Sequence, residues 1–309
     1  MISIVIPVFN SASTLSKTIG SVKSQSFQDF EAIIVNDGST DNSLETINQE
    51  IKDDLRFVII NQTNSGVSAA RNCGILKAKY DFVAFLDADD EWENDYLEKI
   101  NFQISKFPSC IGYGTLYKRC LKYGNEKLKI TNTSENNSCF IISSVADQLI
   151  KGGLPFFTSS IVVRKKILLG AGMFHEKINC GEDLLMWIKI SLQGEIAIFS
   201  KMCVNYNITI NQNGKLRRKN DLINDFCNEL SKLNGSLSQV QINQLSSDSH
   251  YSRYLNSLVT VNRITNIKSI LNEFAKMILF DPYKVKRYIL IILFFFPSFL
   301  IDKIFLYKK

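Results

Sequence analysis

The chain has 309 residues, of which 45% are hydrophobic and 21% charged, and this composition excludes a disordered or collagen-like protein. Its net charge is +6, and +4 of that lies in residues 281–309, so the basic excess belongs to the carboxyl-terminal tail. Seven cysteines without a Cys-x-x-Cys pair and only two histidines favour neither a disulfide framework nor a zinc site, and a reducing cytosol is the simpler environment.

The amino-terminal region predicts alternating strands and helices. Residues 2–8 are a short apolar, β-branched run without the basic segment of a signal peptide, so we expect a strand there. Leu15, Ile19 and Val22 then form one apolar stripe of a helix. The alternation continues with strands over 30–35, 57–60 and 82–86 and helices over 43–51 and 67–78. This order predicts an α/β fold with an open, mostly parallel sheet and helices on both faces.

The rest of the chain shows a mixed pattern that ends in a mainly helical extension. Leu97, Ile100 and Ile104 predict a helix that begins near Asp95 and ends before Pro108. The later expectations are a strand at 111–117, a polar loop at 122–138, an extended segment at 154–163, helices at 165–169 and 182–192, and surface helices within 222–270. The predicted parts are a domain over 1–210, a helical extension over 211–282 and a hydrophobic, basic-flanked tail over 283–309.

Polar residues follow each of the first four predicted strands. They are Asn10, the run 36–39, the run 61–65 and the run 87–90. The carboxyl ends of parallel strands meet at one edge of an open sheet, where such folds bind ligands. Each run alone has the composition of an ordinary turn, but four of them on one rim indicate a binding site.

Two groups of carboxylates can carry chemistry. Asp87, Asp89 and Asp90 crowd one loop, where their repulsion favours Mg²⁺ or Mn²⁺ held together with a substrate diphosphate. The alternative is a solvated acidic turn that caps the next helix. Glu182 and Asp183 open another predicted helix, where a carboxylate serves either as an N-cap or as a general base. The sequence has no Gly-x-Gly-x-x-Gly or Walker lysine loop, which disfavours dinucleotide oxidoreductases and NTPases.

Five segments resemble, in order, the signature of family 2 glycosyltransferases. They read IVIPVFN at 4–10, VNDGSTD at 35–41, NSGVSAARNCG at 64–74, FLDADD at 85–90 and GED at 181–183. The resemblance covers roughly the first two thirds of the chain. It implies a GT-A fold, in which residues 1–210 form the nucleotide-sugar-binding and catalytic domain.

The resemblance also implies a role for each matching residue. The expected donor-binding residues are Pro7, Phe9 and Asn10 at the base, Asp37 at the uracil ring, Asn64, Gly66 and Arg71 beside the nucleotide, Asp87 at the ribose, and Ala88. Asp89 is the expected ligand of a divalent metal, Mn²⁺ or Mg²⁺, that bridges the diphosphate. Asp183 is the expected catalytic base, and Glu182 either supports it or touches the acceptor.

The implied reaction is metal-dependent, inverting transfer of a sugar from a nucleotide-sugar, expected to be a UDP-sugar, to a glycan or lipid-linked acceptor in surface polysaccharide synthesis. A non-catalytic nucleotide-sugar-binding or scaffold subunit is the alternative, and a metal-dependent nucleotidyltransferase is disfavoured by the missing phosphate loop. The chain departs from the family pattern at 206–211, where many relatives carry an Arg and a His. Four basic residues downstream either replace them as phosphate donors or form a solvated loop: Lys215, Arg217, Arg218 and Lys219.

The tail contains a run of 14 residues without a charge, at 288–301. A helix of that length reaches about 21 Å, short of the ~30 Å bilayer core, and Pro297 interrupts it. Basic residues flank the run on both sides, so we expect peripheral contact with anionic lipid at the inner face of the cell membrane. A core helix or an oligomer contact is the alternative, and no nucleic-acid partner is expected.

Overall fold

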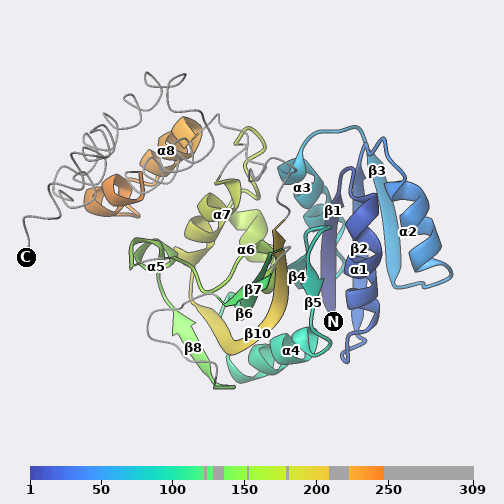
Figure 1. The fold of residues 1–309 in the computed structure, drawn as a ribbon. Helices are drawn as coiled ribbons and strands as arrows, with labels where there is room; N and C mark the ends of the chain where they lie inside the picture. The colour runs from blue at the N-terminus through green and yellow to red at the C-terminus, as the bar shows by residue number, and fades with distance from the viewer. Residues whose placement is uncertain (122–123, 128–135, 152, 179–180, 209–222, 247–309) are drawn as a thin grey trace, which may run out of the picture. The chain divides into compact units, whose positions relative to one another are not determined.

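The computed structural model describes residues 1–121, 124–127, 136–151, 153–178, 181–208 and 223–246 (Figure 1). The chain divides into two compact units, Met1–Ser236 and Leu237–Lys309, and the elements named below belong to the first. The predicted boundary at residue 210, the basic residues at 215–219 and the tail lie outside the described residues. In the described part, no helix is long and apolar enough to span a bilayer, and the six cysteines are free thiols.

The described residues follow the predicted alternation of strands and helices through the first four strands. The strands are β1 (Ile2–Val8), β2 (Phe30–Asp37), β3 (Phe57–Gln62), β4 (Phe82–Phe85), β5 (Glu91–Trp92), β6 (Gly112–Leu121), β7 (Gly124–Lys127), β8 (Cys139–Ile142), β9 (Ile161–Arg164) and β10 (Ile196–Ile208). The helices are α1 (Ala12–Lys23), α2 (Ser43–Ile51), α3 (Val67–Lys77), α4 (Tyr96–Lys106), α5 (Val145–Lys151), the 3-10 turn η1 (Thr158–Ser160), α6 (Lys165–Gly170), α7 (Glu182–Ser191) and α8 (Ile223–Ser231).

One mixed sheet carries these strands in the order β3-β2-β1-β4-β9-β6-β10-β5, with β7 paired to β6 and β8 paired to β10. The first four strands pair in parallel, as do β6 and β10, whereas β5, β7, β8 and β9 join their neighbours antiparallel. Ile2 lies opposite both Phe30 and Phe82, so the carboxyl ends of β1, β2 and β4 meet at one edge of the sheet. The predicted α/β architecture is confirmed.

Helices cover both faces of the sheet at β1 (Figure 1). Ile4 and Ile6 pack with Leu15 of α1 in one buried cluster. Val5 points to the opposite face, where α3 crosses so closely that a Cβ at Gly74 would lie 2.3 Å from Val5 Cγ1. Alternate residues of β1 are therefore buried on opposite faces, which explains the uninterrupted apolar run that predicted this strand.

Gly74→Ala is expected to destabilise the protein, whereas Gly20→Ala should leave it unchanged or slightly more stable. A methyl group at position 74 must displace Val5 in a packed core, which costs about 1–3 kcal/mol of unfolding free energy. Gly20 lies in α1 with no atom within 4 Å of a Cβ placed there, so alanine adds only helix propensity. Urea unfolding followed by circular dichroism compares the variants, and equal midpoints would contradict the close packing of α3 on β1.

The predictions for the segments at 122–138 and 154–163 are wrong in part. The predicted polar loop at 122–138 contains β7, because main-chain hydrogen bonding to β6 forms a strand there without apolar alternation. The predicted extended segment at 154–163 contains η1. The chain turns there because Ser160 Oγ accepts a hydrogen bond from Phe157 N at 2.9 Å and donates one to Phe157 O at 3.1 Å.

Candidate active site

The acidic loop, residues 87–90, follows β4 and is fixed to α1 through its main chain. Thr14 Oγ1 donates to Ala88 O at 2.8 Å, and Thr18 Oγ1 donates to the same oxygen at 3.0 Å. Thr18 Oγ1 also lies 2.8 Å from Asp90 O. Ala88 is buried and acts in this anchoring through its carbonyl. The loop therefore presents its carboxylates from a fixed main chain at the carboxyl edge of the sheet.

Asp37 at the end of β2 shapes the loop that follows β3. Its carboxylate accepts hydrogen bonds from the main-chain N–H groups of Ser65 at 2.8 Å and Gly66 at 2.9 Å. Gly38, at φ +69°, lets the two loops touch, because a Cβ there would lie 2.8 Å from Asn64 N. This contact brings Asp37, Asn64 and Gly66 together, as the predicted site requires. The bond from Asp37 to a uracil ring stays a prediction.

The end of β1 carries the three residues predicted to surround the base. Asn10 has a left-handed conformation at φ +49°, and its Oδ1 accepts from Thr40 N at 2.8 Å, which ties β1 to the loop after β2. Phe9 is 49% exposed, so its ring is accessible to a flat ligand such as a nucleobase. Pro7 is buried within β1 and supports this edge from inside the sheet. Base binding by the three residues stays a prediction.

Arg71 of α3 joins the acidic loop to the first turn of α7. Its Nη2 lies 2.8 Å from Asp87 Oδ1, and its Nη1 lies 3.4 Å from Glu182 Oε1. The guanidinium also lies 5.2 Å from the centre of the Phe174 ring, and the side chain is only 5% exposed. Burial disfavours the charge, but the two carboxylates outweigh burial and raise the pKa of Arg71. Arg71 is therefore a fixed cation between the two predicted groups of carboxylates.

Asp183 lies in the first turn of α7 and is held on two sides. The N-cap of the helix is Gly181, in the left-handed conformation at φ +83°, so the N-cap alternative does not describe Asp183. Asp183 Oδ1 accepts from Leu184 N at 2.8 Å, and Oδ2 lies 3.4 Å from Thr158 Oγ1. The carboxylate therefore has a defined orientation at the end of a helix whose following residues are buried.

Glu182 is expected to make stability fall as the pH rises from about 4.5 to about 7. Burial, and then the neighbouring Asp183, raise the pKa of Glu182 from 4.5 to about 7. In that window the folded state keeps a proton that the unfolded state has released, so the unfolding free energy falls by at most about 1.4 kcal/mol per pH unit. Glu182→Gln removes this contribution. Chemical denaturation of both proteins across the window measures it, and parallel curves would contradict the raised pKa.

The three carboxyl groups of the acidic loop disfavour one another's ionisation. Burial, and then the charge of Asp87, raise the pKa of Asp89 to about 6. Asp90 is fully buried, and burial with the charges of Asp87 and Asp89 raises its pKa well above the usual range. Among the described residues, only Asp87 of these three forms an ion pair, and its partner is Arg71. A bound divalent cation would favour the ionised form of these carboxylates.

Asp89 has the chemistry of a ligand for Mg²⁺ or Mn²⁺. Both ions prefer carboxylate oxygens, and Mg²⁺ takes one or two of them together with water and substrate phosphates. Over the residues that the structure describes, no group of three or more His, Cys, Asp and Glu side chains could hold a metal on its own. The carboxylate of Asp89 fits a metal that takes its other ligands from water and a bound diphosphate.

Three residues that sequence reasoning missed hold the acidic loop and Asp183. Asn207 N donates to Asp90 Oδ1 at 3.0 Å, and Asn207 Nδ2 donates to Asp89 O at 2.8 Å. Ser159 bonds the acidic loop, and Thr158 contacts Asp183. The only signal for these two was a Thr-Ser-Ser run inside an otherwise apolar stretch. Asn207 lies in the segment 206–211 that departs from the family pattern, but nothing in the local sequence predicts its contacts with the acidic loop.

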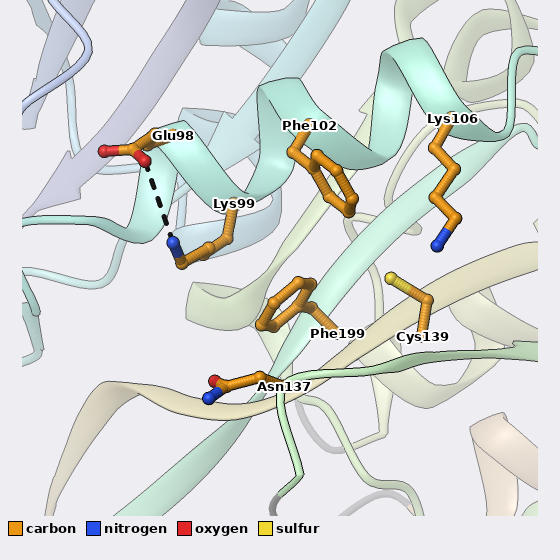
Figure 2. A pocket seen from close by; sticks show the side chains of 7 residues that line it. All are labelled: Glu98, Lys99, Phe102, Lys106, Asn137, Cys139 and Phe199. Atoms are coloured by element: carbon orange, nitrogen blue, oxygen red, sulfur yellow. Dashed lines mark ion pairs between the residues drawn. The ribbon is translucent and has the colours of Figure 1, made fainter.

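A separate cavity of about 190 Å³ is lined by none of the predicted site residues (Figure 2). The Phe102 and Phe199 rings meet edge to face there, with centres 6.1 Å apart and planes at 86°. Its lining residues are Glu98, Lys99, Phe102, Lys106, Asn137, Cys139 and Phe199. The cavity is therefore distinct from the group of carboxylates around Arg71.

A parallel half-sheet with an acidic loop at its carboxyl edge, faced by a second carboxylate pair, defines a GT-A type fold. The chain belongs to glycosyl transferase family 2, whose family model matches residues 3–169. That range includes the acidic loop and Arg71, whereas α7 with Asp183 lies beyond it. The predicted family is confirmed.

Known relatives and structures agree with this assignment. An uncharacterized glycosyltransferase of Haemophilus influenzae is 42% identical over 137 residues, which are 44% of this chain and 54% of that protein. The putative teichuronic acid biosynthesis glycosyltransferase TuaG of Bacillus subtilis is 29% identical over 207 residues, which are 66% of this chain and 77% of that protein. The match spans about half or less of the first three curated relatives' lengths.

The fold is similar to that of TarS from S. aureus. The crystal structure of TarS 1-349 in complex with UDP has a TM-score of 0.66 at 21% sequence identity, covering 92% of this chain and 82% of that chain. The complex with UDP-GlcNAc has a TM-score of 0.69 at 20% identity, with the same coverage. At this level of identity the likeness shows the fold.

Proposed function

We propose that the chain transfers a sugar, with inversion, from a UDP-sugar to a hydroxyl of a glycan or lipid-linked acceptor in the synthesis of a surface polysaccharide. The bridge formed by Arg71 carries this proposal, because it places the Asp87 end of the acidic loop opposite Glu182. An inverting transfer needs charge stabilisation at the leaving diphosphate and a base on the opposite side of the sugar. The UDP complexes of TarS and the teichuronic acid assignment of TuaG support the donor and the polysaccharide.

The donor side consists of the edge from β1 to β4. Phe9 would stack on the uracil, and Asp37 would hold the neighbouring loop and accept from the base. Asp87 would bond the ribose while its ion pair with Arg71 fixes the position of its carboxylate. Asp89 would hold Mn²⁺ or Mg²⁺, which supplies positive charge to the departing diphosphate when bound.

The acceptor side consists of α7 and the segments around it. Asp183 would remove the proton from an acceptor hydroxyl as its oxygen bonds to the anomeric carbon and the bond from that carbon to the diphosphate oxygen breaks. Glu182 would stay beside it and contact the acceptor. Phe157 precedes Thr158, which contacts Asp183, and its ring is centred 4.5 Å from Tyr117 and 4.8 Å from Tyr206. Such rings are suited to the apolar face of an acceptor sugar.

A screen of UDP-sugars tests the proposal. The purified chain is incubated with UDP-glucose, UDP-galactose or UDP-GlcNAc and Mn²⁺, and released UDP is measured. We expect release from at least one donor and none when EDTA removes the metal. UDP-sugar binding without release would favour a non-catalytic binding subunit instead, and neither binding nor release would contradict the proposal.

We also propose peripheral contact between the tail at 283–309 and anionic lipid, which the sequence alone supports. The uncharged run at 288–301 would insert into the interface and the flanking lysines would face the headgroups. Such contact would hold the chain at a membrane surface, where lipid-linked acceptors are found.

A further inference from the structure

We infer that the buried turn at 157–160 sets the separation between the two ends of the active site, with Ser159 positioning the acidic loop and Thr158 positioning Asp183. This inference rests on the proposed roles of Asp89 and Asp183. It adds two positioning residues, which act through Asp90 and Asp183. Their adjacency is the key observation, because one peptide unit connects the contact on the metal side to the contact on the base side.

Ser159 holds the acidic loop at both ends of the Asp89 segment. It is fully buried, and its Oγ donates to Asp90 Oδ2 at 2.6 Å and accepts from Asp87 N at 3.1 Å. Its carbonyl accepts from Trp92 Nε1 at 2.7 Å, which fixes the turn to β5. Asp89 lies between the two points that Ser159 holds, so the position of its carboxylate depends on this hydroxyl.

Thr158 contacts the proposed base from the same turn. Its side chain is buried, and its Oγ1 donates toward Asp183 Oδ2 at 3.4 Å. This distance is long for an O–H···O hydrogen bond, and contacts of this kind at catalytic groups tighten when substrate binds. A hydroxyl at this position orients the Asp183 carboxylate toward the acceptor.

The turn itself is held firmly enough to act as a spacer. Ser160 Oγ closes it through bonds to the main chain of Phe157 at 2.9 and 3.1 Å. The ring of Phe157 packs against Tyr117 and Tyr206, with centres 4.5 and 4.8 Å away, and the two tyrosine rings also contact each other at 6.2 Å. A shift of the turn would therefore move Asp183 and the acidic loop together.

Substitutions at the two adjacent residues test this inference, because each should change a different kinetic constant. Thr158→Val keeps the shape and removes the hydroxyl, so kcat for UDP release should fall about tenfold while the donor KM stays unchanged. Thr158→Ser should restore kcat. Ser159→Ala frees the acidic loop, so the Mn²⁺ concentration for half activity and the donor KM should rise about tenfold with a smaller change in kcat. Thr46→Val on α2 is the matched control and should change neither constant.

The assay follows UDP release from the best donor of the screen, with Mn²⁺ and water as acceptor, and circular dichroism confirms that each variant is folded. A merely structural turn would give both variants the same pattern, with lower melting temperatures and no separation of kcat from KM, and that result would overturn the inference. Failure of Thr158→Ser to restore kcat would also overturn it. An inactive wild-type protein would instead overturn the proposed function, and this inference with it.

Discussion

Asp183→Asn is expected to lower sugar transfer by about 10²- to 10⁴-fold while the affinity for the donor stays unchanged. The amide keeps the size of the carboxylate and its bond to Leu184 N, but it cannot take a proton from the acceptor. Donor binding depends on residues at the other edge of the site, so calorimetry with UDP and Mn²⁺ should give the wild-type affinity. UDP release and transfer are measured on the same preparation.

Glu182→Gln is the comparison for this variant, because it alters the neighbouring carboxylate of the same helical turn. We expect it to lower transfer far less than Asp183→Asn, since Glu182 is paired with Arg71 and is not the proposed base. Transfer near the wild-type rate in a folded Asp183→Asn protein would remove Asp183 from the mechanism. Unfolding of that variant would instead assign the residue a structural role.

Asp89→Ala is expected to abolish metal-dependent binding of UDP and to leave the fold intact. The carboxylate carries a raised pKa from burial and from Asp87, so its charge is costly without a cation. Loss of the Asp89 carboxylate should therefore not destabilise the metal-free protein. At pH values above 6 it should increase the free energy of unfolding slightly. Calorimetry with Mn²⁺ and UDP measures the binding, and thermal denaturation measures the fold.

Asp29→Ala serves as the control for the change in net charge, because Asp29 is exposed and lies before β2, outside the site. It should leave the metal-dependent affinity unchanged. Equal affinity for UDP and Mn²⁺ in wild-type and Asp89→Ala proteins would show that Asp89 is not the metal ligand. A comparable loss in both variants would show that the effect is one of overall charge.

The first half of the fold follows from local sequence because each element there has a simple environment. β1 is buried on both faces, so its apolar run at 2–8 is unbroken and its predicted bounds match the structure. α2 was predicted with its observed bounds at 43–51. The second half of the sheet is different, because β7 and β8 depend on pairing with β6 and β10. β10 also contains two register irregularities near Met202, which disturb any alternation.

The candidate site was predictable in its residue types and not in its contacts. The carboxylates stand out because they follow strands or open a helix, and the structure brings Asp87 and Glu182 together on Arg71. Local sequence does not show that one arginine serves both groups, since this depends on how α3 and α7 pack. The partner of the buried Ser159 hydroxyl could not be predicted for the same reason. The role of this hydroxyl arises from Asp90, far away in the sequence.

The most direct test of the proposed donor site is the position of Mn²⁺ in crystals of the full chain grown with UDP and Mn²⁺, located by anomalous scattering. We predict one strong peak within about 2–2.3 Å of a carboxylate oxygen of Asp89 and in contact with the diphosphate. The uracil ring should lie beside Phe9 and Asp37, and Asp183 should lie on the opposite side of the donor-sugar position. A peak bound elsewhere, or UDP bound away from the acidic loop, would contradict the account.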